Sequence, residues 1–464
     1  MSVNLTESGL NVDFYQLTSL VPHFDAKRLD QMMTMSFFVR SMPAHREYLV
    51  WAGLRRIMDF LFGTGFSETD IQHLLAHPLL GGVLAKRPKL IDRFRRWKFD
   101  GGNREIWALP EGHLVFANEG VSVSDVGCGL QLPPAYMPFM EVTADLFTLK
   151  VIETPLLSII NQMVGVATAT MRMVKVANGR PIIEGGQRRT GKDSSSDASY
   201  AAYVGGAASV SNVRTFAQYG VPCGGTMDHF AILACQLPDV SQAEAETQFF
   251  REFYKVYPNN AMLLVDTFDT FGATTGIRNA VATVGAENLK GIRMDSGVTP
   301  ESVLAARQLL DSLGASQAGI VISGGLTVEK IAALKDSPIN GFVVGENISC
   351  VADSPVTGAT AKICAIGPHP VMKVAKGTGK GTLPGPISVH RNEQGDFDLH
   401  FRGFSPETNL MAPVYQNGQF DNTQCDIGSA RARASLQAND TFPKFVSIGD
   451  DLVRQIAKLL KENK

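Results

Sequence analysis

Six short apolar runs, each followed by glycine or charged residues and then by helix-like sequence, constrain the fold of this chain most strongly. They lie at residues 181–189, 224–229, 261–269, 291–297, 319–326 and 341–347. Apolar runs that lack polar alternation are typical of strands buried on both faces of a parallel sheet. In such a sheet the reactive positions lie just past the carboxyl ends of the strands, where this chain collects its charged residues and glycines. The pattern predicts an α/β enzyme.

The chain has 464 residues, which is too long for one ordinary domain. Its βα units predict a TIM-like, irregular β/α barrel, because only six are clear and eight close a regular barrel. We predict an N-terminal α+β domain, the barrel-like domain, and a C-terminal segment that packs back on the N-terminal domain. The boundaries of these three segments are 1–150, 151–365 and 366–464.

Local patterns predict individual elements in the two outer segments. We expect a strand at 34–40 and a helix that begins at the N-cap residue Ser67. A hairpin is expected around Pro110 and Gly112. In the C-terminal segment, strands are expected at two places, 372–374 and 396–401.

Composition and charge exclude several other classes of protein. The formal net charge of −2 gives no sign of a partner that is nucleic acid or a membrane surface. No stretch approaches the roughly 20 apolar residues of a membrane helix, and the N-terminus lacks the regions of a secretory signal. Six cysteines are scattered singly, without a Cys-x-x-Cys motif, which favours free thiols in a reducing cytoplasm.

Glycine turns end the last two predicted strands. Gly324 and Gly325 follow one strand, and Gly345 follows the next. Such turns expose backbone N–H groups that suit a phosphate monoester. The alternative is that these glycines only make tight turns.

Charged residues follow the other predicted strands. Arg293 and Asp295 are two residues apart and so share a face of one strand, and Asp266 ends the preceding strand. Carboxylates in this position can hold Mg²⁺, bind ribose hydroxyls or stabilise a developing cation. A purely structural Arg–Asp pair is the alternative.

Two further groups extend this predicted site. Arg188, Arg189 and Lys192 form a cationic cluster that suits pyrophosphate or a carboxylate, unless it is simply a solvated charge run. His229 follows a predicted strand end beside Asp228, which can orient its ring for a nucleophilic or acid–base role. A lone histidine is more often structural.

Taken together, these motifs resemble the nicotinate phosphoribosyltransferase family, over about residues 13–391. Nine motifs occur in the family's order. They are Asp13-Phe-Tyr-Gln-Leu-Thr, Phe37-Phe-Val-Arg-Ser-Met-Pro with Ala52-Gly-Leu, Gln187-Arg-Arg, Gly205-Gly with Ser211-Asn-Val, Gly225-Thr-Met-Asp-His, Val265-Asp-Thr-Phe-Asp-Thr, Arg293-Met-Asp-Ser-Gly, Ser323-Gly-Gly-Leu and Leu383-Pro-Gly.

The resemblance implies an ATP-coupled pentosyl transfer that joins nicotinate to phosphoribosyl pyrophosphate and feeds NAD synthesis. It implies a homodimer with shared active sites, in which Tyr15 of one chain stacks on the pyridine ring and Arg188 holds the carboxylate. His229 matches the histidine that ATP phosphorylates, and Asp266 and Asp295 are expected to act in catalysis. Phosphoribosyl pyrophosphate and Mg²⁺ are expected to bind with Arg293, Asp295, Gly324, Gly325 and Gly345.

Departures from the family pattern keep the substrate open. Gly185 stands where an aromatic residue is usual, and Ser209-Val210 replaces the usual Gly-Thr. Ser211 stands where nicotinamide-preferring relatives carry an aspartate, which favours the acid over the amide. The alternatives are phosphoribosyl transfer to nicotinamide or quinolinate, or a catalytically silent paralogue that binds a metabolite.

Overall fold

The computed structural model describes residues 7–116, 136–375, 378–439 and 445–462. It divides the chain into two compact units. The terminal unit comprises Met1–Gly165 and Ser354–Lys464, and the central unit is Val166–Asp353. The divisions therefore fall at 165 and 353, where the sequence patterns placed them at 150 and 365. The first division lies within helix α6 (Leu146–Val176), and the second precedes strand β14 (Ala359–Ile366).

The central unit is built on a six-stranded sheet in which every pair of neighbouring strands is parallel. The strand order is β10-β11-β12-β13-β8-β9. The strands are β8 (Ile182–Glu184), β9 (Ser209–Val210), β10 (Met262–Leu264), β11 (Gly291–Met294), β12 (Gly319–Ile322) and β13 (Gly341–Val344). The mixed α/β fold is therefore confirmed. The two end strands, β9 and β10, are not paired with each other within the described residues, so a closed barrel is not seen there.

Five of the six predicted apolar runs contain these strands, and the prediction for 224–229 was wrong. Just before this run, Cys223 makes one isolated parallel bridge to Val210 of β9, on the side of β9 that does not pair with β8. The physical reason is that residues 222–225 are exposed. Two of them, Gly224 and Gly225, have no side chain to bury in a sheet.

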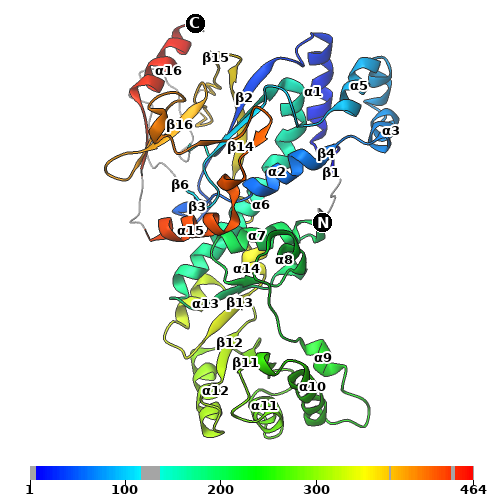
Figure 1. Ribbon diagram of the computed structural model, residues 1–464, viewed down its shortest axis with the longest axis vertical. Coiled ribbons are helices and arrows are strands. Elements are labelled where there is room, and N and C mark those ends of the chain that lie inside the picture. The colour runs from blue at the N-terminus through cyan, green and yellow to red at the C-terminus, as the bar shows by residue number, and fades with distance from the viewer. Residues whose placement is uncertain (1–6, 117–135, 376–377, 440–444, 463–464) are drawn as a thin grey trace. The chain divides into compact units, whose positions relative to one another are not determined.

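Helices connect and flank the central strands (Figure 1). Three of them, α12, α13 and α10, begin at threonine or serine N-caps, which are Thr299, Thr327 and Ser241. Such caps satisfy backbone N–H groups that a helix start leaves unpaired. The helices are α7 (Ser195–Val204), α8 (Val213–Tyr219), α9 (His229–Leu233), α10 (Gln242–Val256), α11 (Gly276–Val284), α12 (Pro300–Ser312), α13 (Val328–Ala333) and α14 (Glu346–Ser349).

The terminal unit contains a seven-stranded antiparallel sheet of order β15-β14-β2-β7-β5-β18-β19. Strands that follow residue 353 pair with N-terminal strands, β14 with β2 and β18 with β5. The strands are β2 (Met32–Val39), β5 (Glu105–Ala108), β7 (Met140–Asp145), β14, β15 (His369–Pro370), β18 (Ala412–Gln416) and β19 (Gln419–Phe420). The strand expected at 34–40 is β2.

Smaller sheets and helices complete the terminal unit (Figure 1). The further strands are β1 (Glu7–Ser8) paired with β4 (Thr64–Gly65), β3 (Tyr48–Val50) paired with β6 (Leu114–Phe116), and β16 (Ile387–Arg391), β17 (Phe397–Phe401) and β20 (Val446–Ile448) in one sheet. The helices are α1 (Phe14–Asp25), α2 (Leu54–Gly63), α3 (Glu68–Ala76), α4 (Gly81–Ala85), α5 (Pro88–Arg96), α15 (Ile427–Ala438) and α16 (Asp450–Glu462).

Local predictions in this unit had mixed outcomes. Ser67 caps α3 in a capping box with Asp70, as expected. The expected hairpin around Pro110 was wrong, because β5 and β6 join different sheets and Gly112 bonds the backbone of Trp51 instead. No strand forms at 372–374, whereas β17 forms at the other expected place.

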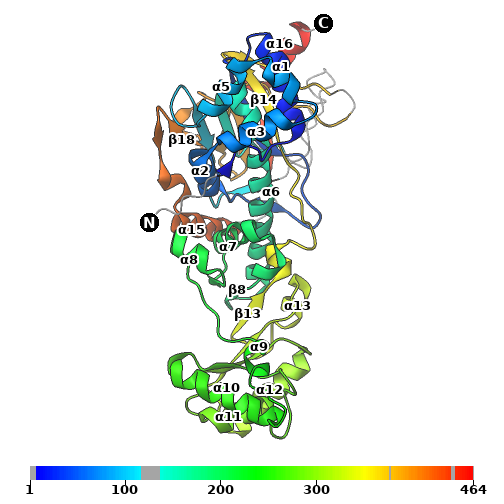
Figure 2. The same ribbon diagram turned by 90° about the vertical axis from the view of Figure 1, so that its right-hand side faces the viewer.

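The 31-residue helix α6 corrects one further expectation (Figure 2). Its most apolar 18-residue window has a mean hydropathy of 1.3, which is enough to cross a membrane by length and composition alone. Polar residues interrupt the apolar runs of α6, so the sequence shows no continuous apolar stretch there. Since 61% of that window is buried within the protein, α6 has the character of a core helix.

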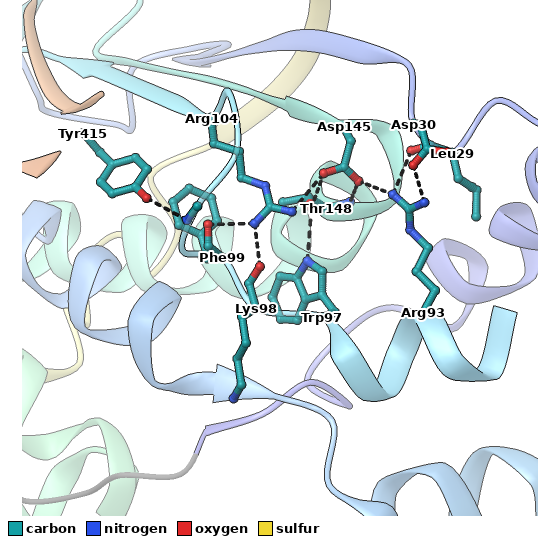
Figure 3. A network of polar contacts seen from close by, with 11 residues as sticks. Leu29, Asp30, Arg93, Trp97, Lys98, Phe99, Arg104, Asp145, Thr148 and Tyr415 are labelled. Carbon is teal, nitrogen blue, oxygen red and sulfur yellow. Dashed lines mark hydrogen bonds and ion pairs between the residues drawn. The ribbon is translucent and has the colours of Figure 1, made fainter. Parts of the chain in front are cut away.

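A buried ionic network supports the terminal unit (Figure 3). Asp145 at the end of β7 accepts hydrogen bonds from Arg93 Nη2 at 2.8 Å and Arg104 Nη2 at 3.1 Å. It also accepts from Thr148 Oγ1 at 2.7 Å, and Thr148 Oγ1 accepts from the indole of Trp97. Burial opposes ionisation, but the bonds from Thr148 and the charge of Arg104 prevail and lower the pKa of Asp145. The network joins α5, β7 and the start of α6.

Candidate active site

The central unit holds a cavity of about 750 Å³ at the carboxyl ends of its strands. The predicted site residues that line it are Arg188, Ser211, Arg293, Asp295, Gly324, Gly325 and Gly345. Apolar side chains of Ile183, Val321 and Val343, from β8, β12 and β13, line it as well. The cavity therefore combines an apolar wall with cations, carboxylates and glycine turns. This is the composition of a site for a partly apolar, anionic ligand.

A larger cavity of about 1350 Å³ lies in the terminal unit, between α1, α5 and the residues that follow α5. Its inner arginines, Arg93 and Arg104, already bond Asp145 and backbone carbonyls. The other cations on its wall, such as Arg96 and Lys98, are exposed. Size alone therefore does not identify the active site, and the smaller cavity in the central unit is the candidate.

Arg293 presents an unsatisfied guanidinium to the central cavity. Its Nη2 donates to the carbonyl of Met227 at 2.8 Å, but its buried Nε has no hydrogen-bond partner among the described residues. Burial lowers the pKa of Arg293, although the nearby carboxylates of Asp295 and Asp266 oppose that shift. A buried donor without a partner is rare in proteins, and its charged guanidinium favours an anion bound beside Arg293.

Asp266 lies behind the cavity wall rather than on it. Its Oδ2 accepts from the backbone N–H of Asp295 and from Ser296 Oγ, both at 2.7 Å, so it ties the end of β10 to the turn after β11. Its Oδ1 is buried without a hydrogen-bond partner in the described structure and lies 3.7 Å from Nε2 of His229. Asp266 can therefore act on the cavity only through Asp295 or His229.

His229 begins helix α9, and its ring is held by residues that the sequence did not indicate. Nδ1 lies 3.1 Å from Thr267 Oγ1, and Nε2 faces Asp266. Asp228, which was expected to orient the ring, instead accepts from the N–H of Ala231 and caps α9. That expectation was wrong, because a carboxylate at a helix N-cap is bonded by the first turn of its own helix.

The three glycines in these turns differ in how much room each leaves for a side chain. Gly324 has φ +90°, and a Cβ built on it would lie 1.8 Å from the carbonyl oxygen of Asp295. Gly325 has φ +56°, but a Cβ there would meet only Lys330 Nζ, at 3.6 Å. A Cβ on Gly345 would make ordinary contacts at 3.8 Å. Gly324 thus serves packing against Asp295, whereas Gly325 and Gly345 leave open backbone on the cavity wall.

The two glycine turns are joined to each other. Asn347 in α14 donates from Nδ2 to the carbonyl of Leu326 at 2.7 Å. Because α14 has only four residues, a phosphate here would be held by turn N–H groups rather than by a helix dipole.

The predicted cationic cluster is divided in the structure. Arg188 is exposed at the cavity, and no hydrogen bond or ion pair to it is seen within the described part of the chain. Arg189 also lines the cavity, with Nε 3.6 Å from Glu346 Oε2. Lys192 does not line the cavity, and its side chain is 96% exposed. The expectation of three clustered cations therefore holds for the two arginines only.

Tyr15 belongs to the terminal unit and so lies outside the unit that forms the cavity. It is the second residue of α1 and is 57% exposed. Partial burial and the carboxylates of Glu153 and Asp13 raise the pKa of its hydroxyl. A large, exposed aromatic side chain is available for contact with a partner.

Glu184, at the end of β8, is a site residue that sequence reasoning missed. It is fully buried and accepts four hydrogen bonds, from Gly186, Gln187, Ser199 and Ser349. The available signal was a lone carboxylate that directly follows the apolar pair Ile182-Ile183 and precedes two glycines.

No cluster of three or more potential metal ligands of the His, Cys, Asp and Glu types occurs in the described ranges. A dedicated all-protein metal site is therefore absent from this part of the chain. Three carboxylates line the cavity, those of Asp228, Asp295 and Glu346, and Asp266 lies behind its wall.

The fold and the site together are those of an α/β enzyme that acts on a small molecule. Residues 10–123 match the family described as nicotinate phosphoribosyltransferase (NAPRTase) N-terminal domain. The chain is 34% identical over 371 residues to nicotinate phosphoribosyltransferase pncB1 of Mycobacterium tuberculosis, covering 80% of this chain and 75% of that protein. It is 29% identical to pncB2 of the same organism, over 99% of this chain and 95% of that protein. The chain belongs to the nicotinate phosphoribosyltransferase family.

Solved structures share the fold. Human nicotinic acid phosphoribosyltransferase superposes with a TM-score of 0.73 at 21% identity, over 97% of this chain and 99% of that one. Nicotinate-nucleotide pyrophosphorylase from Pyrococcus furiosus gives a TM-score of 0.70 at 21% identity, over 93% and 95%. The relative of 34% identity confirms the family resemblance seen in the motifs.

Proposed function

We propose that this enzyme joins nicotinate to phosphoribosyl pyrophosphate, releases pyrophosphate and feeds NAD salvage. The observation that carries the proposal is one cavity that holds two cations with unused bonding capacity, Arg188 and Arg293, beside glycine turns and Asp295. Family membership supplies the reaction class. Ser211 on the cavity wall places no carboxylate near a nicotinate carboxylate, which supports the acid as substrate.

The geometry supports a direct displacement at the ribose. The 5-phosphate is bound by the turns at Gly325 and Gly345, and the carboxylate of nicotinate pairs with Arg188. The pyridine nitrogen then forms a bond to ribose C1 while the bond from C1 to the pyrophosphate oxygen breaks. Pyrophosphate leaves with that electron pair, and Arg293 offsets its charge. Asp295 stabilises the positive charge that develops at C1.

Mg²⁺ fits the residues present. This ion commonly binds through one or two carboxylates together with substrate phosphates and water, so it needs no all-protein cage. Asp295 on the wall would hold the ion, and Asp266, which accepts from the backbone N–H of Asp295 at 2.7 Å, would keep that residue in place. When bound, the ion would offset charge on the departing pyrophosphate.

We further propose that ATP drives the reaction by phosphorylating His229. The imidazole would attack the γ-phosphorus, so that an N–P bond forms and the bond to ADP breaks. Support comes from the ring's accessibility, since its side chain is 40% exposed, and from Thr267, which fixes Nδ1. Because Nδ1 is bonded to Thr267, Nε2, which lies 3.7 Å from Asp266 Oδ1, is the nitrogen that would carry the phosphoryl group.

A homodimer with shared active sites is part of the proposal. Near the cavity, large apolar side chains on α8, α9 and the turn after α9 are exposed, namely Val213 at 72%, Phe216 at 55%, Phe230 at 77% and Leu237 at 63%. Apolar surface of this kind favours burial against a second copy. The partner's α1 would then bring its exposed tyrosine, the one at position 15, to the pyridine ring. Mixing inactive Tyr15→Ala and Asp295→Asn chains should restore activity, and no recovery in verified mixed dimers would contradict sharing.

The proposal extends to the architecture of the central sheet and to the cellular compartment. We infer that the central sheet is an irregular barrel with its opening between β9 and β10, the two ends of the strand order. The five cysteines in the described ranges are all free, which supports a reducing cytoplasm.

A product assay with nicotinate, nicotinamide or quinolinate as the acceptor, with and without ATP, tests the function. We expect a mononucleotide from nicotinate only, at a higher rate with ATP. Quinolinate needs a second cation for its second carboxylate, and Lys192 points away while Arg189 lies beside Glu346. No product from any base, with phosphoribosyl pyrophosphate still bound, would indicate the catalytically silent alternative.

A further inference from the structure

One buried carboxylate joins the two ends of the candidate active site. Glu184 Oε1 accepts from the backbone N–H of Gly186 at 2.5 Å and from Ser349 Oγ at 2.7 Å. Its Oε2 accepts from Gln187 Nε2 at 2.8 Å and from Ser199 Oγ at 2.7 Å. All four donors converge on a side chain with no solvent exposure.

These donors belong to the elements that carry the ligand-binding groups. Gly186 and Gln187 precede Arg188 in the loop after β8, and Ser349 ends α14, whose N-cap is Gly345. The loop and α14 are in direct contact, because a Cβ on Gly186 would lie 2.0 Å from Ser349 Oγ. Glu184 thus fixes the cationic loop and one glycine turn to the same strand end.

The connection extends to the rest of the cavity wall. The side-chain oxygen of Gln187 accepts from Asn212, which caps α8 and follows Ser211. On the other side, Asn347 joins α14 to the turn at Leu326. Both the carboxylate-binding and the phosphate-binding sides of the cavity are therefore linked through Glu184.

The chemistry of Glu184 argues for a role beyond packing. No cation lies in an ion pair with it among the described residues, so four neutral donors alone compensate its burial. A buried charge costs stability relative to an apolar side chain of the same volume. Donors converging from three elements, in contrast, give a fixed geometry that an apolar side chain cannot give.

We propose that Glu184 is the positioning residue that sets the spacing between Arg188 and the Gly345 turn, and so aligns the pyridine nitrogen with ribose C1. This inference rests on the proposed function. Alignment of reacting groups is a large part of catalysis, and small misplacements far from the reacting atoms slow a reaction strongly. Glu184 itself does not line the cavity and is not a catalytic residue.

Two serine variants form a matched test. Ser349→Ala and Ser199→Ala each remove one buried hydroxyl that donates to Glu184 at 2.7 Å. Ser349 belongs to the helix of the Gly345 turn, whereas no residue of α7, which contains Ser199, lines the cavity. We expect Ser349→Ala to raise KM for phosphoribosyl pyrophosphate about tenfold, the size of one charged hydrogen bond. Ser199→Ala should lower the melting temperature similarly and change the KM for phosphoribosyl pyrophosphate less than twofold. Because Ser199 Oγ also accepts from Gln187 Nε2 at 2.5 Å, this variant is a control for the phosphoribosyl pyrophosphate side only.

A variant at Gln187, which bonds Oε2 of Glu184, tests the nicotinate-binding side of the cavity. Gln187→Ala should raise KM for nicotinate about tenfold and leave that for phosphoribosyl pyrophosphate nearly unchanged. Glu184→Gln keeps the shape of the side chain but replaces one carboxylate oxygen by an amide group, whose N–H would face two other donors. It should raise the KM values for nicotinate and for phosphoribosyl pyrophosphate and lower kcat. Equal effects of the two serine variants on both KM values, or stability losses without any KM change, would overturn the positioning role.

Calorimetric binding of phosphoribosyl pyrophosphate alone separates this inference from the proposed function. If the wild type binds it but forms no nicotinate mononucleotide, the proposed function fails. The role of Glu184 is then tested by binding alone. Ser349→Ala should bind phosphoribosyl pyrophosphate about tenfold more weakly than Ser199→Ala does. A wild type that binds no phosphoribosyl pyrophosphate would overturn both.

Discussion

The adjacent glycines Gly324 and Gly325 offer the sharpest separation between a packing role and a binding role. Both have positive φ, so an alanine at either position costs about 1–2 kcal/mol of backbone strain. At Gly324 the added Cβ would also overlap the carbonyl oxygen of Asp295 at 1.8 Å. Backbone cannot yield as a flexible side chain can, so this overlap adds about 1–3 kcal/mol. At Gly325 the nearest atom, Lys330 Nζ, lies at 3.6 Å and can move.

Thermal unfolding with and without phosphoribosyl pyrophosphate measures both effects. For a domain of the central unit's size, each kcal/mol shifts the melting temperature by about 2–4 °C. Gly324→Ala should therefore lose about 2–12 °C more than Gly325→Ala. Gly325→Ala, although more stable, should lose much of the ligand-induced stabilisation, which for the wild type is about 2.7 kcal/mol at a hundredfold excess over Kd. Equal losses in both variants, or full stabilisation of Gly325→Ala by the ligand, would refute this reasoning.

Three further predictions concern single side chains. Arg188→Ala should weaken nicotinate binding by about 2–5 kcal/mol if the bound ligand buries the ion pair, and it should affect nicotinamide far less; equal losses would show that Arg188 binds another group. His229→Ala should abolish the acid-labile phosphoryl label from γ-labelled ATP and leave a slow, ATP-independent transfer, and ATP hydrolysis that continues in step with product would contradict the phosphohistidine. Burial lowers the pKa of His113 to about 4, so the unfolded chain binds the extra proton as pH falls from about 6.5 to 4 and the free energy of unfolding drops by about 3 kcal/mol. Denaturant unfolding across that range should show a weaker pH dependence in His113→Phe, and an unchanged slope would assign the effect to other groups.

Strand positions in the central unit could be predicted because buried parallel strands leave a continuous apolar signal. The exception was residues 224–229, where glycines mimic a strand end but offer nothing to bury. Pairing between strands far apart in the sequence could not be predicted in the same way. The partners of β5 and β6 depend on which sheet each joins, and no local pattern near Pro110 encodes that choice.

Which residues gather at the cavity could also be predicted, because strand ends converge at one edge of a parallel sheet. Their individual partners could not. Asp228 caps its own helix, Lys192 extends into solvent, and Asp266 bonds the turn after β11, all through tertiary geometry. Glu184 escaped notice for the same reason, since its four donors come from places up to 165 residues away along the chain.

Formation of the bond between the pyridine nitrogen and ribose C1 is the central claim, and isotope-edited NMR observes it directly. Nicotinate labelled with ¹⁵N at the ring nitrogen and phosphoribosyl pyrophosphate labelled with ¹³C at C1 would be incubated with the enzyme. The account predicts a new C1 resonance with a one-bond coupling to ¹⁵N, formed in step with pyrophosphate. A C1 resonance that stays with the starting material, or that moves to free ribose 5-phosphate without nitrogen coupling, would contradict it.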